Sequence, residues 1–451
     1  MKRYYFIILA TILFAITGCK KSSTEPKPEA PEAEKPEGVA WTDDQWKTIQ
    51  TLRQVDDQGY LYEMNCLFDY KTDEVLKDNS DNLVSLLNVI KKVILPDSKT
   101  SFTEILGLNL DSIYSFCGGC TCFSANGKNG GYVMGRNYDF PPMDDHTLIV
   151  HTPQVKDANG KVIRYATVGT ADMGILTQFM GEELGYRTTR MQELALYAPY
   201  FILDGMNEEG LMAGLMVLEY DGTYQATTGK TNLTNAMITR VILDNCKSVS
   251  EAVAMLSQFN IISIFQVSGE STIPWIDMHF EFADKDGNRA VIEWTENEMR
   301  VLQGDDLKNN PRTQDPEYPT IHPQKGDNYV VATNYYLSKD AMEFPEGMTL
   351  SNEMGFWRHD VVDSLLYLKQ SITSQDAMDI CHAARIMKND PDCIAKMEAK
   401  MELDPTLDID NKLDWPWITI WSSVYNNQDM SVLFCSREDY EHRYKLSLLY
   451  K

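Results

Sequence analysis

Three cysteines close together are the residues of this sequence best suited to chemistry. They lie in the segment 117–122, which reads CGGCTC. It has three interpretations: a buried turn with a disulfide, a redox or metal site with Cys-x-x-Cys spacing, and a thiol nucleophile. A redox pair normally opens a helix, whose dipole lowers a thiol pKa, whereas Cys120 opens a predicted strand. A zinc site needs a second ligand pair, and the chain has no other Cys-x-x-Cys.

The nucleophile interpretation has a simple physical basis if the chain is cut between Gly119 and Cys120. A thiol needs a base to become a thiolate, and a new α-amine on Cys120 has an ordinary pKa of about 8. The base is then on the same residue as the sulfur, so no histidine partner is required. Gly118 and Gly119 allow the bent backbone through which the sulfur can reach the Gly119 carbonyl.

A charged motif follows in the next predicted strand. The segment 135–140 reads GRNYDF, with Arg136 sixteen residues after Cys120 and Asp139 three residues later. The turn residues NGKNGG at 126–131 predict a β-hairpin that returns both side chains toward Cys120. Arg136 would favour the thiolate, and Asp139 would accept a hydrogen bond from the α-amine. A surface ion pair of little energy is the alternative.

This arrangement closely resembles the opening of the choloylglycine hydrolase family. Mature chains of that family begin Cys-Thr or Cys-Ser and continue with Gly-Arg-Asn-x-Asp at this spacing. The family includes penicillin V acylases, bile salt hydrolases, and the acid ceramidase and N-acylethanolamine acid amidase branch. DGMNEEGL at 204–211 is similar to a family hairpin, Asn334 to an asparagine of the oxyanion hole, and Arg358 to a second site arginine. The resemblance covers 120–451.

The resemblance implies a fold and a reaction. The fold is α+β: the N-terminal-nucleophile (Ntn) hydrolase four-layer αββα sandwich of two antiparallel sheets, here with a helical N-terminal prefix. The reaction is hydrolysis of linear, non-peptide carbon–nitrogen bonds of small N-acyl amides, through an acyl-thioester on Cys120 after self-cleavage at Gly119. No metal or organic cofactor is required. The plainer interpretations are a strand-end cap for Asn334 and an ordinary helix-start charge for Arg358.

One position departs from the family pattern. Met216 stands where bile salt hydrolases have asparagine and penicillin V acylases have tyrosine. Methionine cannot donate a hydrogen bond, so a backbone N–H or another side chain must assist Asn334. We therefore expect Met216 to line the substrate site of an enzyme for N-acyl amides with an apolar acyl group, ahead of bile salts or penicillins. A thiol-redox or binding lipoprotein that uses Cys117 and Cys120 is the alternative of another class.

The N-terminus predicts export and lipidation. A basic start, MKR, precedes an apolar run at 6–16 that is too short to span a bilayer, and small residues then precede Cys19. This resembles a bacterial lipoprotein signal at 1–18, with lipid on Cys19 anchoring the protein to a membrane of the cell envelope. An ordinary secretory signal is the alternative. The Pro/Glu-rich stretch 19–38 is expected to be a tether.

The rest of the chain divides at the CGGCTC segment. Helical spacing from Leu52 to Leu67 and over 82–90 predicts that 39–119 is a helical propeptide or α-chain, retained by the catalytic domain 120–451 as in the ceramidase-like branch.

The formal net charge of −25 argues against nucleic acid as a partner. The other predicted elements are hairpins at 121–137, 200–218, 279–294 and 417–435, a strand at 329–334, and helices near 235–258, 361–369 and 374–387.

Overall fold

The computed structural model describes residues 34–99, 102, 119–140, 147–174, 186, 188–218, 229–263, 277–295, 298–308, 328–338, 350–386, 418–437 and 439–448. Pro36–Lys451 form one compact unit. The predicted signal peptide, Cys19 and most of the tether lie outside the described residues, as do Cys117 and Gly118. Among the helices that are described, none is long and apolar enough to cross a membrane.

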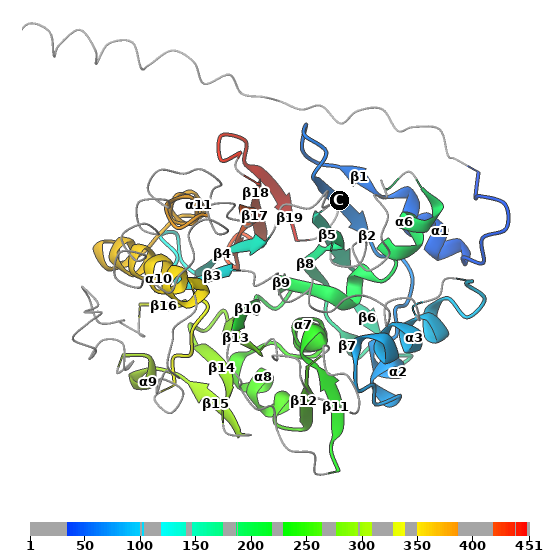
Figure 1. Cartoon of the computed structure of the whole chain (residues 1–451), viewed down its shortest axis with the longest axis horizontal. Coiled ribbons are helices and arrows are strands. Elements are labelled where there is room, and N and C mark those ends of the chain that lie inside the picture. Colours follow the sequence, from blue (N-terminus) through cyan, green and yellow to red (C-terminus); the bar gives the residue numbers. More distant parts are fainter. Residues whose placement is uncertain are drawn as a thin grey trace, which may run out of the picture. The chain divides into compact units, whose positions relative to one another are not determined.

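The larger sheet has nine strands in the order β1-β2-β5-β8-β9-β10-β13-β14-β15 (Figure 1). Neighbouring strands are antiparallel except for the parallel pair of β2 with β5. The bounds are β1 Arg53–Gln54, β2 Leu61–Asn65, β5 Thr147–Thr152, β8 Thr167–Asp172, β9 Ile202–Asn207, β10 Met212–Leu218, β13 Asp277–Ala283, β14 Arg289–Thr295 and β15 Glu298–Leu302.

The second sheet has six antiparallel strands in the order β16-β3-β4-β17-β18-β19. Its bounds are β3 Gly119–Asn126, β4 Tyr132–Phe140, β16 Tyr329–Ala332, β17 Ile418–Asn426, β18 Ser431–Ser436 and β19 Tyr444–Ser447. Two small sheets pair β6 Val155–Lys156 with β7 Val162–Arg164, and β11 Thr231–Thr234 with β12 Phe259–Ile262.

Several of the described helices begin at polar residues whose side chains cap the first turn. Thr373 forms a capping box at the start of α11, and Thr42 forms one at the start of α1. The bounds are α1 Asp43–Gln50, α2 Thr72–Lys77, α3 Leu83–Ile94, α6 Thr189–Ala195, η2 Ala198–Phe201, η3 Asn235–Met237, α7 Ile238–Asn245, α8 Val249–Leu256, α9 Asp305–Lys308, α10 Leu350–Leu368 and α11 Ser374–Ala383.

The two main sheets stack face to face between helices. Strand β3 contacts β10 and β13 of the larger sheet, while α10 and α11 contact the other face of its own sheet. Helix α7 and the short η2 contact the outer face of the larger sheet. The sheets lie close together at Gly214, where a Cβ would lie 2.7 Å from Cys122 Sγ. The predicted four-layer αββα architecture is confirmed.

The four predicted hairpins are also confirmed, as the pairs β3–β4, β9–β10, β13–β14 and β17–β18. Each joins strands that are neighbours in sequence, so turn residues and apolar runs were enough to locate them. Strand β19 was not predicted, although it extends the six-stranded sheet beyond β18.

The prediction of a helical prefix is wrong in part. Helices α1 and α3 exist, but Leu61–Asn65 is strand β2, which lies between β1 and β5. Leu61, Met64 and Asn65 are all buried, and a strand buried on both faces has no period-two pattern that separates it from a helix. The 61–65 segment is therefore part of the sandwich.

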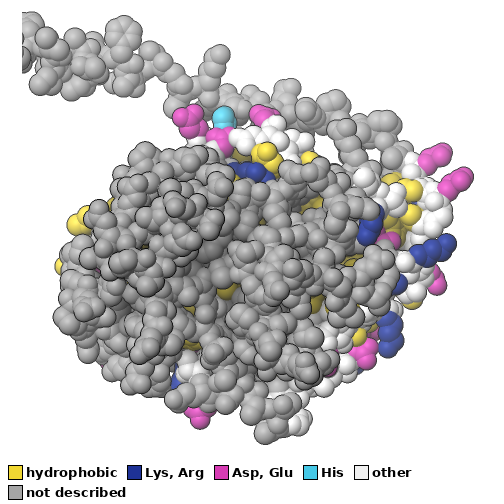
Figure 2. Space-filling view, viewed as in Figure 1, with side chains coloured by type: hydrophobic (Ala, Val, Ile, Leu, Met, Phe, Trp, Pro, Cys, Tyr) yellow, Lys and Arg dark blue, Asp and Glu magenta, His cyan; other side chains and the backbone are white. Residues whose placement is uncertain are grey.

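The prefix also shares a hydrophobic core with the body of the chain. Leu87 and Ile90 of α3 belong to the same buried cluster as Leu243 of α7 and Phe280 of β13. Figure 2 shows acidic and basic side chains next to one another along the right-hand edge, where Figure 1 places α1, α2 and α3. The prefix helices thus have a charged outer surface and an apolar inner one. The expected boundary near Gly118–Gly119 does not separate two cores.

Candidate active site

Cys120 is the second residue of β3 and is buried. The β3–β4 register pairs Cys120 with Tyr138 and Cys122 with Arg136. Side chains that are paired across two strands lie on the same face, so these four face the larger sheet. Cys120 and Cys122 both have free thiols. The hairpin thus brings Arg136 beside the predicted nucleophile.

Arg136 is held against Cys120 by contacts with the larger sheet. Its Nη2 lies 3.5 Å from Cys120 Sγ, and its Nη1 forms an ion pair of 2.6 Å with Asp204 Oδ2. Nε and Nη2 also donate to the Leu215 carbonyl oxygen, at 3.1 and 2.7 Å. A guanidinium has a fixed planar arrangement of donors, so these bonds leave it one orientation. It can therefore stabilise a thiolate without first reorganising.

Sequence reasoning missed Asp204, which lies on β9 beneath Arg136. Its carboxylate is fully buried and accepts hydrogen bonds from Trp421 Nε1 at 3.1 Å and from the Tyr425 hydroxyl. A buried carboxylate is tolerated when it is paired and hydrogen-bonded in this way. The signal for it in the sequence is an aspartate at the end of a predicted strand, in the DGMNEEGL segment at 204–211.

Asp139 lies on the opposite face of β4 from Arg136, because it is three positions further along the strand and successive side chains alternate between the faces. Its Oδ2 pairs with Arg358 Nη1 at 2.7 Å, and its Oδ1 accepts from Thr419 Oγ1 at 2.5 Å. A Cβ placed on Gly119 would lie 3.1 Å from Asp139 Oδ2. Burial raises the pKa of the Asp139 carboxyl, while Arg358 and Thr419 oppose that rise. Asp139 therefore borders the backbone at the expected cut, whereas Arg136 borders the sulfur.

Asn334 and Arg358 complete the surroundings of the Gly119–Cys120 peptide. The Cys120 backbone N–H donates to Asn334 Oδ1 at 2.7 Å, and Arg358 Nη2 donates to the same oxygen at 2.6 Å. In the continuous chain, the residue that accepts the Cys120 N–H is thus Asn334 and not Asp139. Asn334 Nδ2 donates to the Val217 carbonyl at 2.6 Å. An amide nitrogen carries a second hydrogen, which remains suited to a developing oxyanion.

The edge of β10 supplies backbone groups to this site. Strand β9 pairs with β10 only at Met212–Gly214, so the carbonyls of Leu215 and Val217 accept from Arg136 and Asn334 instead. Burial raises the pKa of the Cys120 thiol, whereas Arg136 and a backbone hydrogen bond from Val217 lower it.

Met216 is fully buried in the apolar cluster that contains Cys120. Its thioether cannot donate to an oxyanion, and the neighbouring Val217 backbone supplies a hydrogen bond to the thiol. The structure therefore brings together Cys120, Arg136, Asp139, Asn334 and Arg358, with Met216 nearby, around the Gly119–Cys120 peptide.

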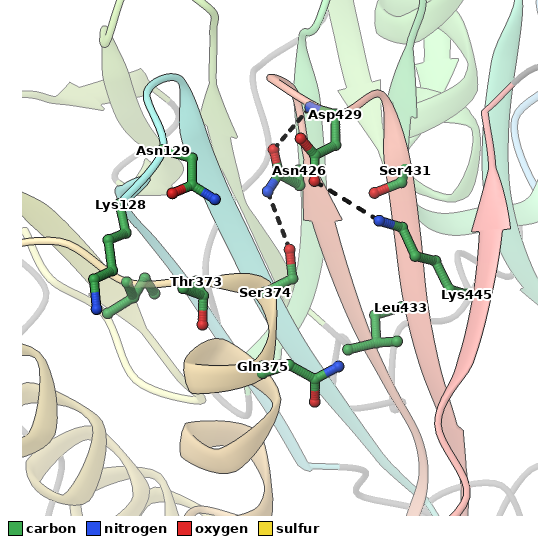
Figure 3. Close-up of a pocket in the computed structure, with 11 residues that line it drawn as sticks. Lys128, Asn129, Thr373, Ser374, Gln375, Asn426, Asp429, Ser431, Leu433 and Lys445 are labelled. Atoms are coloured by element: carbon green, nitrogen blue, oxygen red, sulfur yellow. Dashed lines mark hydrogen bonds and ion pairs between the residues drawn. The ribbon is translucent and has the colours of Figure 1, made fainter. Parts of the chain in front are cut away.

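A polar cavity of about 200 Å³ lies elsewhere in the same sheet (Figure 3). It is lined by residues of the β3–β4 and β17–β18 turns and of the start of α11, among them Lys128, Ser374 and Asp429. Lys128 follows the end of β3, whereas Cys120 is at its beginning, roughly 20 Å away at 3.3 Å per residue. This cavity is therefore separate from the thiol.

The sequence pattern of one protein family matches residues 120–348, beginning at the candidate nucleophile itself. Its description is linear amide C–N hydrolases, choloylglycine hydrolase family. The chain belongs to the choloylglycine hydrolase family. Membership makes it an amide hydrolase of the linear C–N class. No curated protein matches the chain in sequence.

Solved structures of this hydrolase family are similar to the chain. A mutant conjugated bile acid hydrolase from Clostridium perfringens is 17% identical, with 73% of this chain and 92% of that chain covered and a TM-score of 0.45. Penicillin V acylase from Agrobacterium tumefaciens is 16% identical, with 70% and 83% covered and a TM-score of 0.40. Neither likeness says anything about the substrate of this hydrolase.

Thr419 is a positioning residue for Asp139, because its hydroxyl donates to that carboxylate and accepts the Ile386 N–H at 2.9 Å. If the chain is cut after Gly119, as the resemblance implies, we expect Thr419→Val to slow that cleavage by about ten- to a hundredfold, since a hydrogen bond to a charged group contributes about 1.5–3 kcal/mol. The measurement is the rate at which the full-length band disappears on denaturing gels. Thr419→Ser keeps the hydroxyl and should cleave at nearly the normal rate. Normal cleavage by the valine variant would show that Asp139 needs no such support.

Proposed function

We propose that this chain hydrolyses small N-acyl amides through Cys120, which cleavage after Gly119 makes the N-terminal residue of a catalytic chain. The proposal includes an apolar acyl group and an amine, amino acid or sphingoid base as the leaving group. It requires no metal or organic cofactor. The observation that carries it is the convergence of two arginines, one carboxylate and one amide on the Gly119–Cys120 peptide.

Self-cleavage would begin with attack of Cys120 Sγ on the Gly119 carbonyl carbon. The carbon–nitrogen bond then breaks, the acyl group passes to sulfur, and the Cys120 nitrogen takes up a proton as an amine. Water hydrolyses the thioester and releases the Gly119 carboxylate. Because Arg358 and Asp139 border Gly119, and Asn334 accepts the Cys120 N–H, this peptide is held rigidly for attack.

Substrate turnover would repeat this chemistry on another amide. The α-amine accepts the thiol proton, and Sγ attacks the substrate carbonyl to form a tetrahedral oxyanion. The donors for that oxyanion are the second N–H of the Asn334 amide and the backbone N–H of Val217. The amine product leaves with the proton, and the α-amine then activates water to release the acid and restore the thiol.

An apolar acyl group is supported by the cluster around the sulfur. The cluster that contains Cys120 also contains Tyr138, Met216 and Phe356, and Met216 replaces the polar side chains of the bile salt and penicillin enzymes. Bile salts and penicillin V are therefore the second and third substrate classes. The redox alternative depends on Cys117, which lies outside the described part of the chain, and Cys120 has a free thiol.

Retention of the 39–119 segment as an α-chain is a further part of the proposal. The Asp244 carboxylate of α7 accepts hydrogen bonds from Tyr70 at 2.8 Å and Thr72 at 2.9 Å, and pairs with Arg240 at 2.8 Å. A polar junction buried in this way would keep the two pieces together after the cut. Lipid on Cys19 would then hold the whole enzyme at a membrane of the cell envelope, near lipid-like amides.

The deciding experiment uses the chain from residue 20 onward, purified under native conditions. We expect denaturing mass spectrometry and N-terminal sequencing to find two fragments, one beginning Cys120-Thr121-Cys122, that co-elute on native gel filtration. The cleaved protein should then release acid from a panel of N-acyl amines and N-acyl amino acids of increasing chain length. A single uncut chain that acts on none of them would refute the proposal.

A further inference from the structure

A buried histidine–glutamate pair that the proposed mechanism does not use lies in the larger sheet. His279 is on β13, Glu293 is on β14, and both side chains are fully buried. His279 Nδ1 lies 3.0 Å from Glu293 Oε1, and His279 Nε2 lies 2.6 Å from the carbonyl oxygen of Thr333. The ring thus connects the glutamate to the residue that precedes Asn334.

Glu293 also binds the other end of the same segment. Its Oε1 accepts the Leu337 backbone N–H at 2.7 Å, and its Oε2 accepts the Ser338 N–H at 3.0 Å. The segment 333–338 leaves the sheet after β16 and carries Asn334. The pair therefore holds both ends of this segment.

The hydrogen-bond partners determine how the ring is used. The Thr333 carbonyl can only accept, so Nε2 donates to it. Nδ1 shares its hydrogen bond with Glu293 Oε1. Both ring nitrogens are therefore bonded to fixed groups, and the ring cannot flip without losing a bond.

The same strands bear the partners of Asn334. His279 is paired in register with Met216 of β10, and the next residue, Val217, accepts the hydrogen bond of Asn334 Nδ2. Displacing Thr333 would move the amide away from Val217 and Cys120 together. We propose that His279 and Glu293 are positioning residues that hold the Asn334 amide where the oxyanion of the acyl-transfer step develops. This rests on the proposed function.

The test separates oxyanion stabilisation from thiol activation. Glu293→Gln replaces one carboxylate oxygen with a donor, so it cannot keep its bonds to both backbone N–H groups. We expect kcat for N-acyl amide hydrolysis to fall about 100-fold, as for loss of one oxyanion donor, with KM changed less than about threefold. Alkylation of Cys120 by iodoacetamide forms no oxyanion and should keep its normal rate.

Two further variants connect the effect to Asn334. His279→Gln keeps a donor for the Thr333 carbonyl, so its kcat should fall less than that of Glu293→Gln. If Glu293→Gln does not fold, the same measurements are made on His279→Gln. Adding Glu293→Gln to Asn334→Ala should cause no further loss, because the amide being positioned is already absent. Three results would each overturn the inference. The losses of kcat could be additive in the double variant, the kcat of Glu293→Gln could be normal, or kcat and the rate of Cys120 alkylation could fall equally.

Hydrogen exchange tests the inference without substrate. In Glu293→Gln, faster amide exchange confined to 333–338 supports it, and unchanged exchange there overturns it. If the normal chain hydrolyses no acyl amide, the proposed function fails, and this measurement alone decides whether the pair holds the segment.

Discussion

Replacing Cys120 with alanine is expected to leave the chain uncut and to abolish amide hydrolysis. Both steps use the same sulfur, and loss of a nucleophile lowers kcat by about 10⁴-fold or more in other hydrolases. Arg136, Asp139 and Asn334 would remain, but they surround the reacting atom and cannot replace it. The measurements are the intact mass after several days and the initial rate on the best N-acyl amide.

Cys122→Ala is the matched control for this prediction. Cys122 lies two residues along the same strand, on the same face, and is equally buried. Its Sγ faces Gly214 of the larger sheet, whereas the sulfur that accepts a hydrogen bond from Arg136 Nη2 is that of Cys120. We expect this variant to be cut and active. An uncut Cys122→Ala together with a normally cut Cys120→Ala would move the nucleophile to Cys122.

Removing the prefix is expected to prevent folding of the catalytic chain. A chain that begins at Cys120 lacks β2, which pairs in parallel with β5, and loses Met64, Leu86 and Ile90 from the shared core. Burial of such a side chain contributes about 1.5–3 kcal/mol. The loss of several such side chains is comparable to the whole free energy of unfolding of a typical domain, which is about 5–15 kcal/mol. The measurement is the soluble yield and the unfolding transition of 120–451.

Co-expression with 20–119 as a separate chain provides the control. The two chains together should give a soluble complex with a cooperative unfolding transition, because the missing strand and helices are restored without a covalent connection. A soluble, cooperatively folded 120–451 on its own would show that the prefix is a removable propeptide.

The sequence alone predicted the hairpins and the candidate pair Cys120 and Arg136. Turn residues between adjacent apolar runs specify a hairpin locally, so the meeting of Cys120 and Arg136 on β3 and β4 could be predicted. Asn334 and Arg358 were identified only by resemblance to the family, since nothing near them in sequence connects them to Cys120.

Other features depended on contacts between residues far apart in sequence. Strand β2 was expected to be a helix because its burial on both faces comes from neighbours that the chain reaches much later.

The supporting residues of the site were invisible for the same reason. Asp204, Thr419 and His279 come from three different strands, and each is an ordinary polar residue in its own segment. The sequence by itself therefore determined which groups can react. Only the tertiary structure decided which buried partners orient them, because a hydrogen bond between distant strands leaves no local pattern in the chain.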